Sequence, residues 1–193
     1  MNDTVRDEDR LRWALMVYDS LTAAHGDRVA WLAGALASQL GWDVARCRTL
    51  VRAARLHDCG KLATPLVLLR TPAALTPEER AVVQRHPEDG ARIVACVVGD
   101  PLLATIIRSH HERWDGTGYP DRLRGAAIPW AARVLAVADV YDALRSVRPH
   151  KPAWPHAEAL AYLTATSGRL FAPDVVAALV ILCAVCSLTE RTC

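Results

Sequence analysis

The hydrophobic positions of this chain recur with the spacing of α-helices. Between residues 29 and 40, apolar side chains fall at i, i+3, i+4, i+7 and i+11, which places them on one face of a helix. Gly41 follows as a stop signal. Asp43 can cap a second helix, whose apolar positions run from Val44 to Ala54 and which continues into His57. No segment of four or more residues alternates apolar and polar positions between turn signals, so the sequence predicts no β-strand.

Proline and capping residues mark where further helices begin. Thr76-Pro77-Glu78-Glu79 combines a capping hydroxyl, a proline at the first helical position and acidic residues in the first turn. The segment 112–129 is rich in glycine, aspartate and proline, which predicts a structured loop. The pattern predicts a single all-α domain, a bundle of about eight or nine helices, with a lead-in helix over 1–23 and one compact unit over 24–193. The other prolines that open predicted helices are Pro101, Pro129, Pro155 and Pro173.

Composition narrows the class of protein. A length of 193 residues fits one domain, and 52% hydrophobic with 23% charged residues is typical of a globular chain. The net charge of +2 gives no support to a DNA- or RNA-binding function. The 23 basic residues include only two lysines, Lys61 and Lys151, and both lie in motifs described below.

Neither a secretory signal nor a membrane span is predicted. The first ten residues carry charges of both signs, and the longest apolar stretch, Val175–Leu188, has 14 residues where a span needs about 20. The six cysteines lack the spacing of a disulfide framework, so we expect a cytoplasmic protein. Cys183-x-x-Cys186 is interpreted as two packed thiols, with metal or redox use as the alternative.

Histidines recur at intervals that match helical hairpins. His25, His57, His86 and His110 are separated by 32, 29 and 24 residues, and most of these histidines fall at predicted helix boundaries. A bundle can therefore bring them to one end, pointing inward. The adjacent pairs His57-Asp58 and His110-His111 diverge by about 100° on a helix, which suits two metal ions better than one.

Aspartate strengthens this interpretation. Asp139 stands in an apolar helical run, where a carboxylate costs several kcal/mol unless it is paired or bound to a cation. Each residue alone has an ordinary alternative: a solvated His25, a helix-capping His86, or an Asp139 paired with an arginine. The combination of these histidines and aspartates at helix boundaries favours a metal site.

Two motifs carry a resemblance to a known family. The sequence resembles the HD-GYP family, the branch of the HD metallophosphohydrolases that degrades bacterial cyclic dinucleotides. The resemblance covers about residues 24 to 179. It is carried by His57-Asp58-Cys59-Gly60-Lys61 and by His110-His111-Glu112-Arg113-Trp114-Asp115-Gly116-Thr117-Gly118-Tyr119-Pro120. Further matches are His25-Gly26-Asp27-Arg28-Val29, Leu75-Thr76-Pro77-Glu78-Glu79, His86-Pro87-x-x-Gly90, Ala138-Asp139-Val140-Tyr141-Asp142 and Arg148-Pro149-x-Lys151.

The resemblance implies a ligand set for two divalent metal ions, with iron or manganese the expected metals. It assigns one ion to His25, His57 and Asp139, the other to His86, His110 and His111, and a bridging role to Asp58.

The same resemblance implies roles for groups around the metals. Lys61 would reach the scissile phosphate or the leaving oxygen, and Tyr119 with the Gly116/Gly118 turn would shape the mouth of the site. Arg148 and Lys151 would hold a phosphate or a guanine edge. From their positions alone, Asp142, Asp115 and Glu112 are candidates for orienting a ligand histidine, and Asp115 is alternatively a turn residue.

Four positions depart from the family pattern. Leu21 stands where some members carry a glutamate that binds a third metal, which favours two ions here. His150 replaces a tyrosine, and Arg145 replaces a small hydroxyl residue near the substrate end. Ala172 replaces an aspartate before Pro173, which we interpret as a lost helix cap.

These features predict a metal-dependent phosphodiesterase that hydrolyses cyclic di-GMP to linear pGpG, GMP or both, with Asp58 and Lys61 as catalytic residues. A hydroxide bridging the two metals would attack phosphorus. The alternatives are hydrolysis of another cyclic dinucleotide or nucleotide, and a non-catalytic nucleotide sensor. A second copy or a signalling partner could dock on the Gly-Tyr-Pro loop or on the 175–188 helix.

Overall fold

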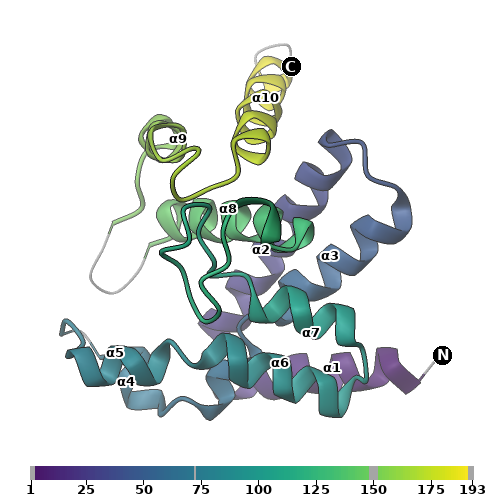
Figure 1. Cartoon of the computed structure of the whole chain (residues 1–193), viewed down its shortest axis with the longest axis vertical. Coiled ribbons are helices and arrows are strands. Elements are labelled where there is room, and N and C mark those ends of the chain that lie inside the picture. Colours follow the sequence, from purple (N-terminus) through teal and green to yellow (C-terminus); the bar gives the residue numbers. More distant parts are fainter. Residues whose placement is uncertain (1–2, 72, 148–151, 191–193) are drawn as a thin grey trace.

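The computed structural model describes residues 3–71, 73–147 and 152–190, without the side chains of 3–5 and 186–190 (Figure 1). The all-α prediction is confirmed, because the described residues form helices and a single isolated β-bridge. Nine of these helices have seven or more residues. They are α1 (Asp3–Tyr18), α2 (Ser20–Gln39), α3 (Val44–Leu56), α5 (Pro77–Val83), α6 (His86–Val97), α7 (Pro101–Arg108), α8 (Trp130–Arg145), α9 (His156–Ala165) and α10 (Pro173–Glu190).

Three shorter helical segments were not expected from the hydrophobic pattern. They are the 3₁₀ helix η1 (Cys59–Ala63), α4 (Leu66–Arg70) and the 3₁₀ turn η2 (Gly125–Ala127). Apart from η2, the predicted loop over 112–129 is free of helix, as the glycine and proline content indicated.

The predicted helix starts are confirmed by their hydrogen bonds. The Asp43 carboxylate accepts from the Arg46 N–H at the start of α3, and Asp100 accepts from the Leu103 N–H at the start of α7. Thr76 and Glu79 form a complete capping box, each side chain bonded to the backbone N–H of the other. These bonds satisfy backbone donors that helix ends otherwise leave without a partner.

Helix α2 is the central element of the bundle. It contacts α1, α3, α8 and α10, and in Figure 1 it lies behind α8. Val29, Ala33 and Leu36 on its predicted apolar face are completely buried in the core. This packing fixes α2 against α8, the two helices that carry His25 and Asp139.

The first helical boundary differs from the prediction. The lead-in helix expected over 1–23 ends at Tyr18, and α2 begins at Ser20, so the expected unit boundary at 24 falls inside α2. Buried Leu11 and Leu15 pack α1 into the bundle, where it contacts α2, α3 and η1. His25 consequently lies within α2 and not at a helix boundary. The prediction differed because the apolar spacing on which it was based begins four residues later, at Val29.

Helix α10 includes the apolar stretch 175–188. Val175 and Leu179 are buried in the core, whereas Ile181 and Val185 are each 50% exposed. Within the described residues, the search for a helix long and apolar enough to cross a bilayer finds none.

Candidate metal centre

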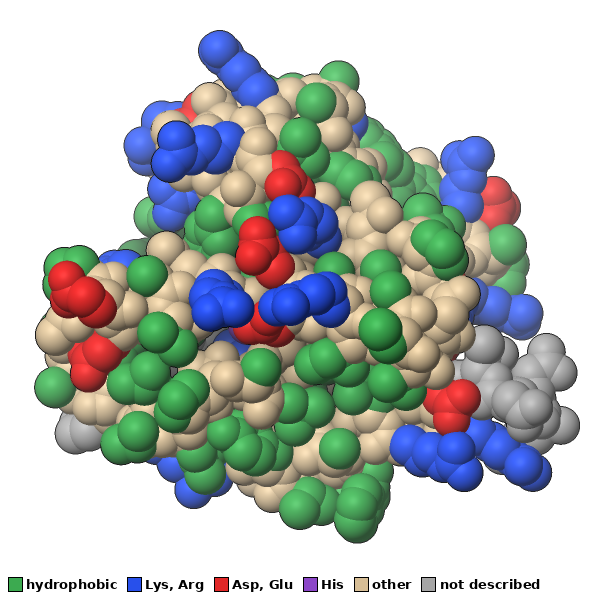
Figure 2. Space-filling view, turned by 60° about the horizontal axis from the view of Figure 1, so that its bottom comes forward, with side chains coloured by type: hydrophobic (Ala, Val, Ile, Leu, Met, Phe, Trp, Pro, Cys, Tyr) green, Lys and Arg blue, Asp and Glu red, His purple; other side chains and the backbone are tan. Residues whose placement is uncertain are grey.

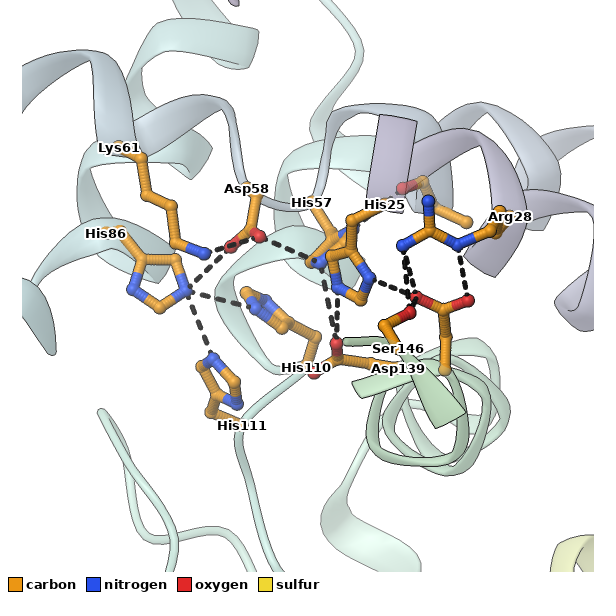
Figure 3. A network of polar contacts seen from close by, with 12 residues as sticks. His25, Arg28, His57, Asp58, Lys61, His86, His110, His111, Asp139 and Ser146 are labelled. Carbon is orange, nitrogen blue, oxygen red and sulfur yellow. Dashed lines mark hydrogen bonds and ion pairs between the residues drawn. The ribbon is translucent and has the colours of Figure 1, made fainter. Parts of the chain in front are cut away.

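The side chains that the sequence singled out converge at one place in the bundle. Figure 3 shows histidines and aspartates from five separate segments pointing toward one another. Most are buried, and no histidine side chain is visible on the face of the molecule drawn in Figure 2. The contributors are His25 on α2, His57 and Asp58 after α3, His86 at the start of α6, His110 and His111 after α7, and Asp139 on α8.

One half of the cluster lies between α2, the end of α3 and α8. His25 Nε2 is 2.8 Å from Asp139 Oδ1, and His57 Nε2 is 3.8 Å from the same oxygen. Ligand atoms of His25, His57 and Asp58 all lie within 4.8 Å of one another. The structure thus brings together the residues that the resemblance assigned to one metal ion.

The other half is made of three imidazoles. His86 Nε2 is 3.3 Å from His110 Nε2 and 3.1 Å from His111 Nε2. Burial lowers the pKa of all three rings, that of His111 to about 3, so the rings are neutral near pH 7. Neutral imidazole is the form of histidine that binds a metal.

Asp58 joins the two halves. Its Oδ1 is 3.2 Å from His86 Nε2, and its Oδ2 is 3.3 Å from His57 Nε2. Its Oδ2 also accepts a 2.6 Å hydrogen bond from Lys61 Nζ. Burial opposes ionisation of Asp58, but Lys61 and the histidines outweigh it and hold the pKa of this carboxyl well below its usual range.

Three of the rings are oriented by the same local contact. The Nδ1 atoms of His57, His86 and His110 lie 2.6–2.8 Å from the carbonyl oxygen three residues earlier in the chain. A carbonyl oxygen can only accept, so each Nδ1 carries the proton, and in the neutral ring Nε2 has a free lone pair. Each helix or turn end thereby aims a bare nitrogen into the cluster.

These bare nitrogens fit cations. The His86 and His110 lone pairs face each other across 3.3 Å and cannot hydrogen-bond. The His57 Nε2 is buried without a hydrogen-bond partner among the described residues, and the oxygens nearest to it belong to carboxylates. A positive ion between such groups turns the repulsion into attraction, and mixed imidazole and carboxylate donors suit divalent transition metals.

Asp142 sets the orientation of His25. Its Oδ2 accepts a 2.6 Å hydrogen bond from His25 Nδ1, which leaves Nε2 directed at Asp139. Arg28 holds Asp142 in turn with two bonds of 2.8 and 2.9 Å. Burial opposes protonation of His25, but its bonds to Asp139 and Asp142 outweigh this and raise its pKa to about 9.

The Gly-Tyr-Pro loop closes over the three imidazoles. The Tyr119 ring lies 4.9 Å from the His111 ring, and burial raises the pKa of its phenol. Gly118 passes so close to the backbone that a Cβ atom would lie 2.4 Å from Arg113 N, and Gly116 has a φ of +81° that favours glycine. The two glycines therefore serve different needs, close approach in one case and a left-handed turn in the other.

Some predicted site residues lie elsewhere. The Asp115 carboxylate bonds the N–H and hydroxyl of Thr117, which is the turn alternative, and it orients none of the described histidines. Arg148 and Lys151, together with His150, lie outside the described residues. Arg145 donates to the Trp154 carbonyl.

The other two departures from the family pattern, Ala172 and Leu21, lie at described positions. Ala172, where we interpreted a lost cap, is buried in the core. Leu21 is 70% exposed and lines the same cavity as His25.

Two residues make contacts that the sequence did not specify. Buried Glu112 accepts from the backbone N–H groups of Asp121 and Leu123 and so braces the Gly-Tyr-Pro loop from within. Arg28 was noted only inside a motif, and its partner Asp142 is 114 residues away. No signal in the sequence could reveal the Arg28 contact, although a glutamate beside two candidate ligands indicated a local role for Glu112.

Comparisons with known proteins agree with this geometry. Residues 12–175 match the family described as HD domain. The "Cyclic di-GMP phosphodiesterase response regulator RpfG" of Xanthomonas campestris pv. campestris is 46% identical over 172 residues, covering 88% of this chain and 46% of the relative. The "3'3'-cGAMP-specific phosphodiesterase 2" of Vibrio cholerae is 38% identical over 161 residues, covering 80% and 30% respectively. The chain thus spans less than half the length of these relatives.

A solved structure supports the same relationship. Bd1817, a HDG"Y"P protein from Bdellovibrio bacteriovorus, superposes with a TM-score of 0.68 at 30% sequence identity. The match covers 82% of this chain and 51% of that one.

Proposed function

The chain belongs to the HD domain family, in its HD-GYP branch, and on that premise we propose that it is a metal-dependent phosphodiesterase that hydrolyses cyclic di-GMP. The observation that carries the proposal is the set of bare, buried histidine nitrogens that face one another and Asp58. The name of the Xanthomonas relative supports cyclic di-GMP as the substrate.

The proposal assigns two divalent ions to the cluster, with iron or manganese the expected metals. His25, His57 and Asp139 would hold one, Asp58 would contact both, and the remaining three ligands would be His86, His110 and His111. When bound, such ions supply an activated water and neutralise charge on phosphoryl oxygens. The ordinary pairing of these donors with divalent transition metals supports the assignment.

The chain's own residues would handle the substrate around this cluster. Lys61 places a positive charge beside Asp58, at the position from which it can contact the scissile phosphate or the leaving oxygen. Tyr119, whose ring lies beside that of His111, would shape the mouth of the site. Arg148 and Lys151 complete the proposal as contacts for a phosphate or a guanine edge.

The experiment is turnover by metal-loaded protein. Protein purified without oxygen and loaded with Fe²⁺ or Mn²⁺ is incubated with cyclic di-GMP, and products are separated by chromatography over time. We expect loss of cyclic di-GMP and appearance of pGpG, GMP or both, and the time course tells which product is final. Unchanged cyclic di-GMP with both metals would overturn the proposal.

A matched pair of histidine variants locates the activity. His110→Ala removes a ligand and should abolish both turnover and bound metal. His156→Ala removes a histidine that lies outside the cluster, where its Nδ1 bonds the Tyr141 hydroxyl, and should preserve both. Equal activity in the two variants would contradict the assigned ligand set.

A second substrate has support of its own. The Vibrio cholerae relative is named as specific for 3'3'-cGAMP, which shares the cyclic dinucleotide ring but replaces one guanine with adenine. Parallel assays with cyclic di-GMP and 3'3'-cGAMP decide between the two by the ratio of kcat/KM.

Location and partners complete the proposal. A cytoplasmic setting is supported by the spacing of the six cysteines, which lacks the pattern of a disulfide framework. Contact with a second copy through α10 is supported by exposed Val180, Ile181 and Val185, and the Gly-Tyr-Pro loop is the other candidate surface. Light scattering tests self-association, since a monomer at all concentrations would rule it out.

A further inference from the structure

A cavity of about 680 Å³ opens beside the His25 side of the cluster. Its wall combines apolar side chains with three cations and one carboxylate, Asp19, and reaches from the proposed catalytic Lys61 to the end of α4. The residues that matter here are Leu21, His25, Arg28, Lys61, Leu69 and Arg70. A cavity of this size and composition fits an anionic ligand that also has apolar faces.

The three cations differ in how firmly they are already paired. Arg28 makes two bonds to Asp142, and Lys61 makes a 2.6 Å bond to Asp58. Arg70 has only a loose ion pair, with its Nη2 3.8 Å from Asp19 Oδ1, and its side chain is 58% exposed. Among the described cations of this wall, Arg70 is therefore the one least engaged by a carboxylate.

A cyclic dinucleotide needs such a group. It carries two phosphodiesters, and only one of them can lie at Asp58 and Lys61 during hydrolysis. The second phosphate keeps its negative charge. Because the ring of the dinucleotide joins the two phosphates, the second one must lie near the first, in the same cavity. A guanidinium binds phosphate through two parallel N–H bonds, a geometry that lysine cannot reproduce.

We propose that Arg70 binds the non-scissile phosphate of the cyclic dinucleotide while the scissile phosphate lies at Lys61 and Asp58. This inference rests on the proposed function and adds a substrate-binding residue from α4, outside the motifs that carry the family resemblance. Leu21 and Leu69 give the same cavity apolar surface against which a base can lie. Arg70 then contributes to substrate affinity and takes no part in bond cleavage.

The competing explanation is structural. Asp19 is buried at the junction of α1 and α2, and its other oxygen accepts a 2.7 Å bond from Thr22 Oγ1. If Arg70 served only to neutralise Asp19, its loss would lower stability and would affect every substrate equally. The test must therefore separate large from small phosphodiesters.

The experiment compares cyclic di-GMP with bis(p-nitrophenyl) phosphate, which has a single phosphodiester and no second phosphate to bind. For Arg70→Ala we expect the KM for cyclic di-GMP to rise about tenfold to a hundredfold, the range of one charge-assisted contact. The kcat for cyclic di-GMP and both constants for bis(p-nitrophenyl) phosphate should stay within twofold. Arg70→Lys should recover part of the lost affinity, because it restores the positive charge but not the two parallel N–H bonds of a guanidinium.

Arg55→Ala is the matched control. Arg55 has the same exposure, 57%, and a similarly loose pair, 3.9 Å to Asp27, but it lies outside the cavity. It should leave both substrates unchanged. An unaltered KM for cyclic di-GMP in Arg70→Ala would overturn the inference. Equal losses of activity on both substrates with a lower Tm would also overturn it. In either case, turnover of cyclic di-GMP by the wild type would still support the proposed function. Failure of the wild-type chain to bind or cleave cyclic di-GMP overturns both.

Discussion

At the scale of single residues, the cluster depends on which nitrogen of each ring carries the proton. His57, His86 and His110 each donate from Nδ1 to a carbonyl three residues back, so one local geometry is used three times. His25 lies inside α2, where no such carbonyl is free, and Asp142 takes over this task. The sequence could predict the histidines and even Asp142, three residues after Asp139, but not the ring orientations.

The role of Asp142 can be measured directly. Asp142→Ala removes the acceptor that orients His25, and we expect metal affinity to fall about tenfold to a hundredfold. Asp142→Asn keeps an oxygen acceptor and should recover part of the affinity. Competition with a chelator gives the Kd, with Asp89→Ala, whose partner is Arg92 on α6, as the control. An unchanged metal affinity in Asp142→Ala would mean that Asp142 pairs with Arg28 but does not orient His25 for metal binding.

Cys59 offers a test of burial beside the cluster. Burial and the negative charge of Asp58 raise the pKa of its thiol to about 12. At pH 8 its thiolate fraction is about a thousandfold below that of a free cysteine, and thiolate is the reactive form. We expect iodoacetamide to modify exposed Cys96 in the folded protein and Cys59 only after denaturation, as peptide mass spectrometry would show. Equal labelling of the two in the folded state would contradict the buried position.

At the scale of elements, the sequence predicted what is local and missed what crosses between segments. The starts of α3 and α5 were readable because a cap and its partner lie three residues apart, and the start of α7 was readable from Pro101. The start of α2 was not, because Asp19 makes no capping bond from its side chain to the helix backbone. The Glu112 carboxylate accepts hydrogen bonds from the N–H groups of Asp121 and Leu123 because the loop folds back on itself. No rule of sequence spacing predicts that fold.

Gly60 shows how closely two elements approach. Where η1 crosses the start of α6, a Cβ on residue 60 would lie 1.9 Å from the His86 carbonyl oxygen and 2.5 Å from Gly90 N. Gly60→Ala must push α6, and with it His86, away from Asp58. We expect a loss of about 3 kcal/mol or more in the free energy of unfolding, and weaker metal binding.

Gly41→Ala is the control for this substitution. Gly41 has a positive φ of +75°, unlike Gly60, but no neighbour within 4 Å of an added Cβ, so only backbone strain remains, about 1 kcal/mol. Thermal unfolding followed by circular dichroism should show the larger fall in Tm for Gly60→Ala. Equal falls would mean that η1 and α6 are not in the close contact described here.

At the scale of the whole molecule, the intervals between histidines predicted that a bundle would bring them together, and the structure gathers them in one cluster. Sequence intervals could not predict the contacts of Arg28 with Asp142 or of Arg70 with Asp19, because these contacts form only when the helices pack together. The resemblance supplied the identities of the ligands. The packing of α2 with α3 and α8, and of α6 with α7 and η1, explains why residues so distant in sequence share one site.

Because the ligands come from five segments, metal binding should stabilise the entire bundle. An ion that binds only the folded chain adds about 2.7 kcal/mol at a hundredfold excess over its Kd, which is roughly 5–11 °C in Tm for a chain of this length. We expect calorimetry to show this rise when Mn²⁺ is added to chelator-treated protein. Asp58→Asn should lose most of the rise and Asp89→Asn should keep it, since Asp89 lies outside the cluster. A Tm that does not respond to Mn²⁺ or Fe²⁺ would mean that the facing histidine nitrogens are held apart by something other than a metal ion.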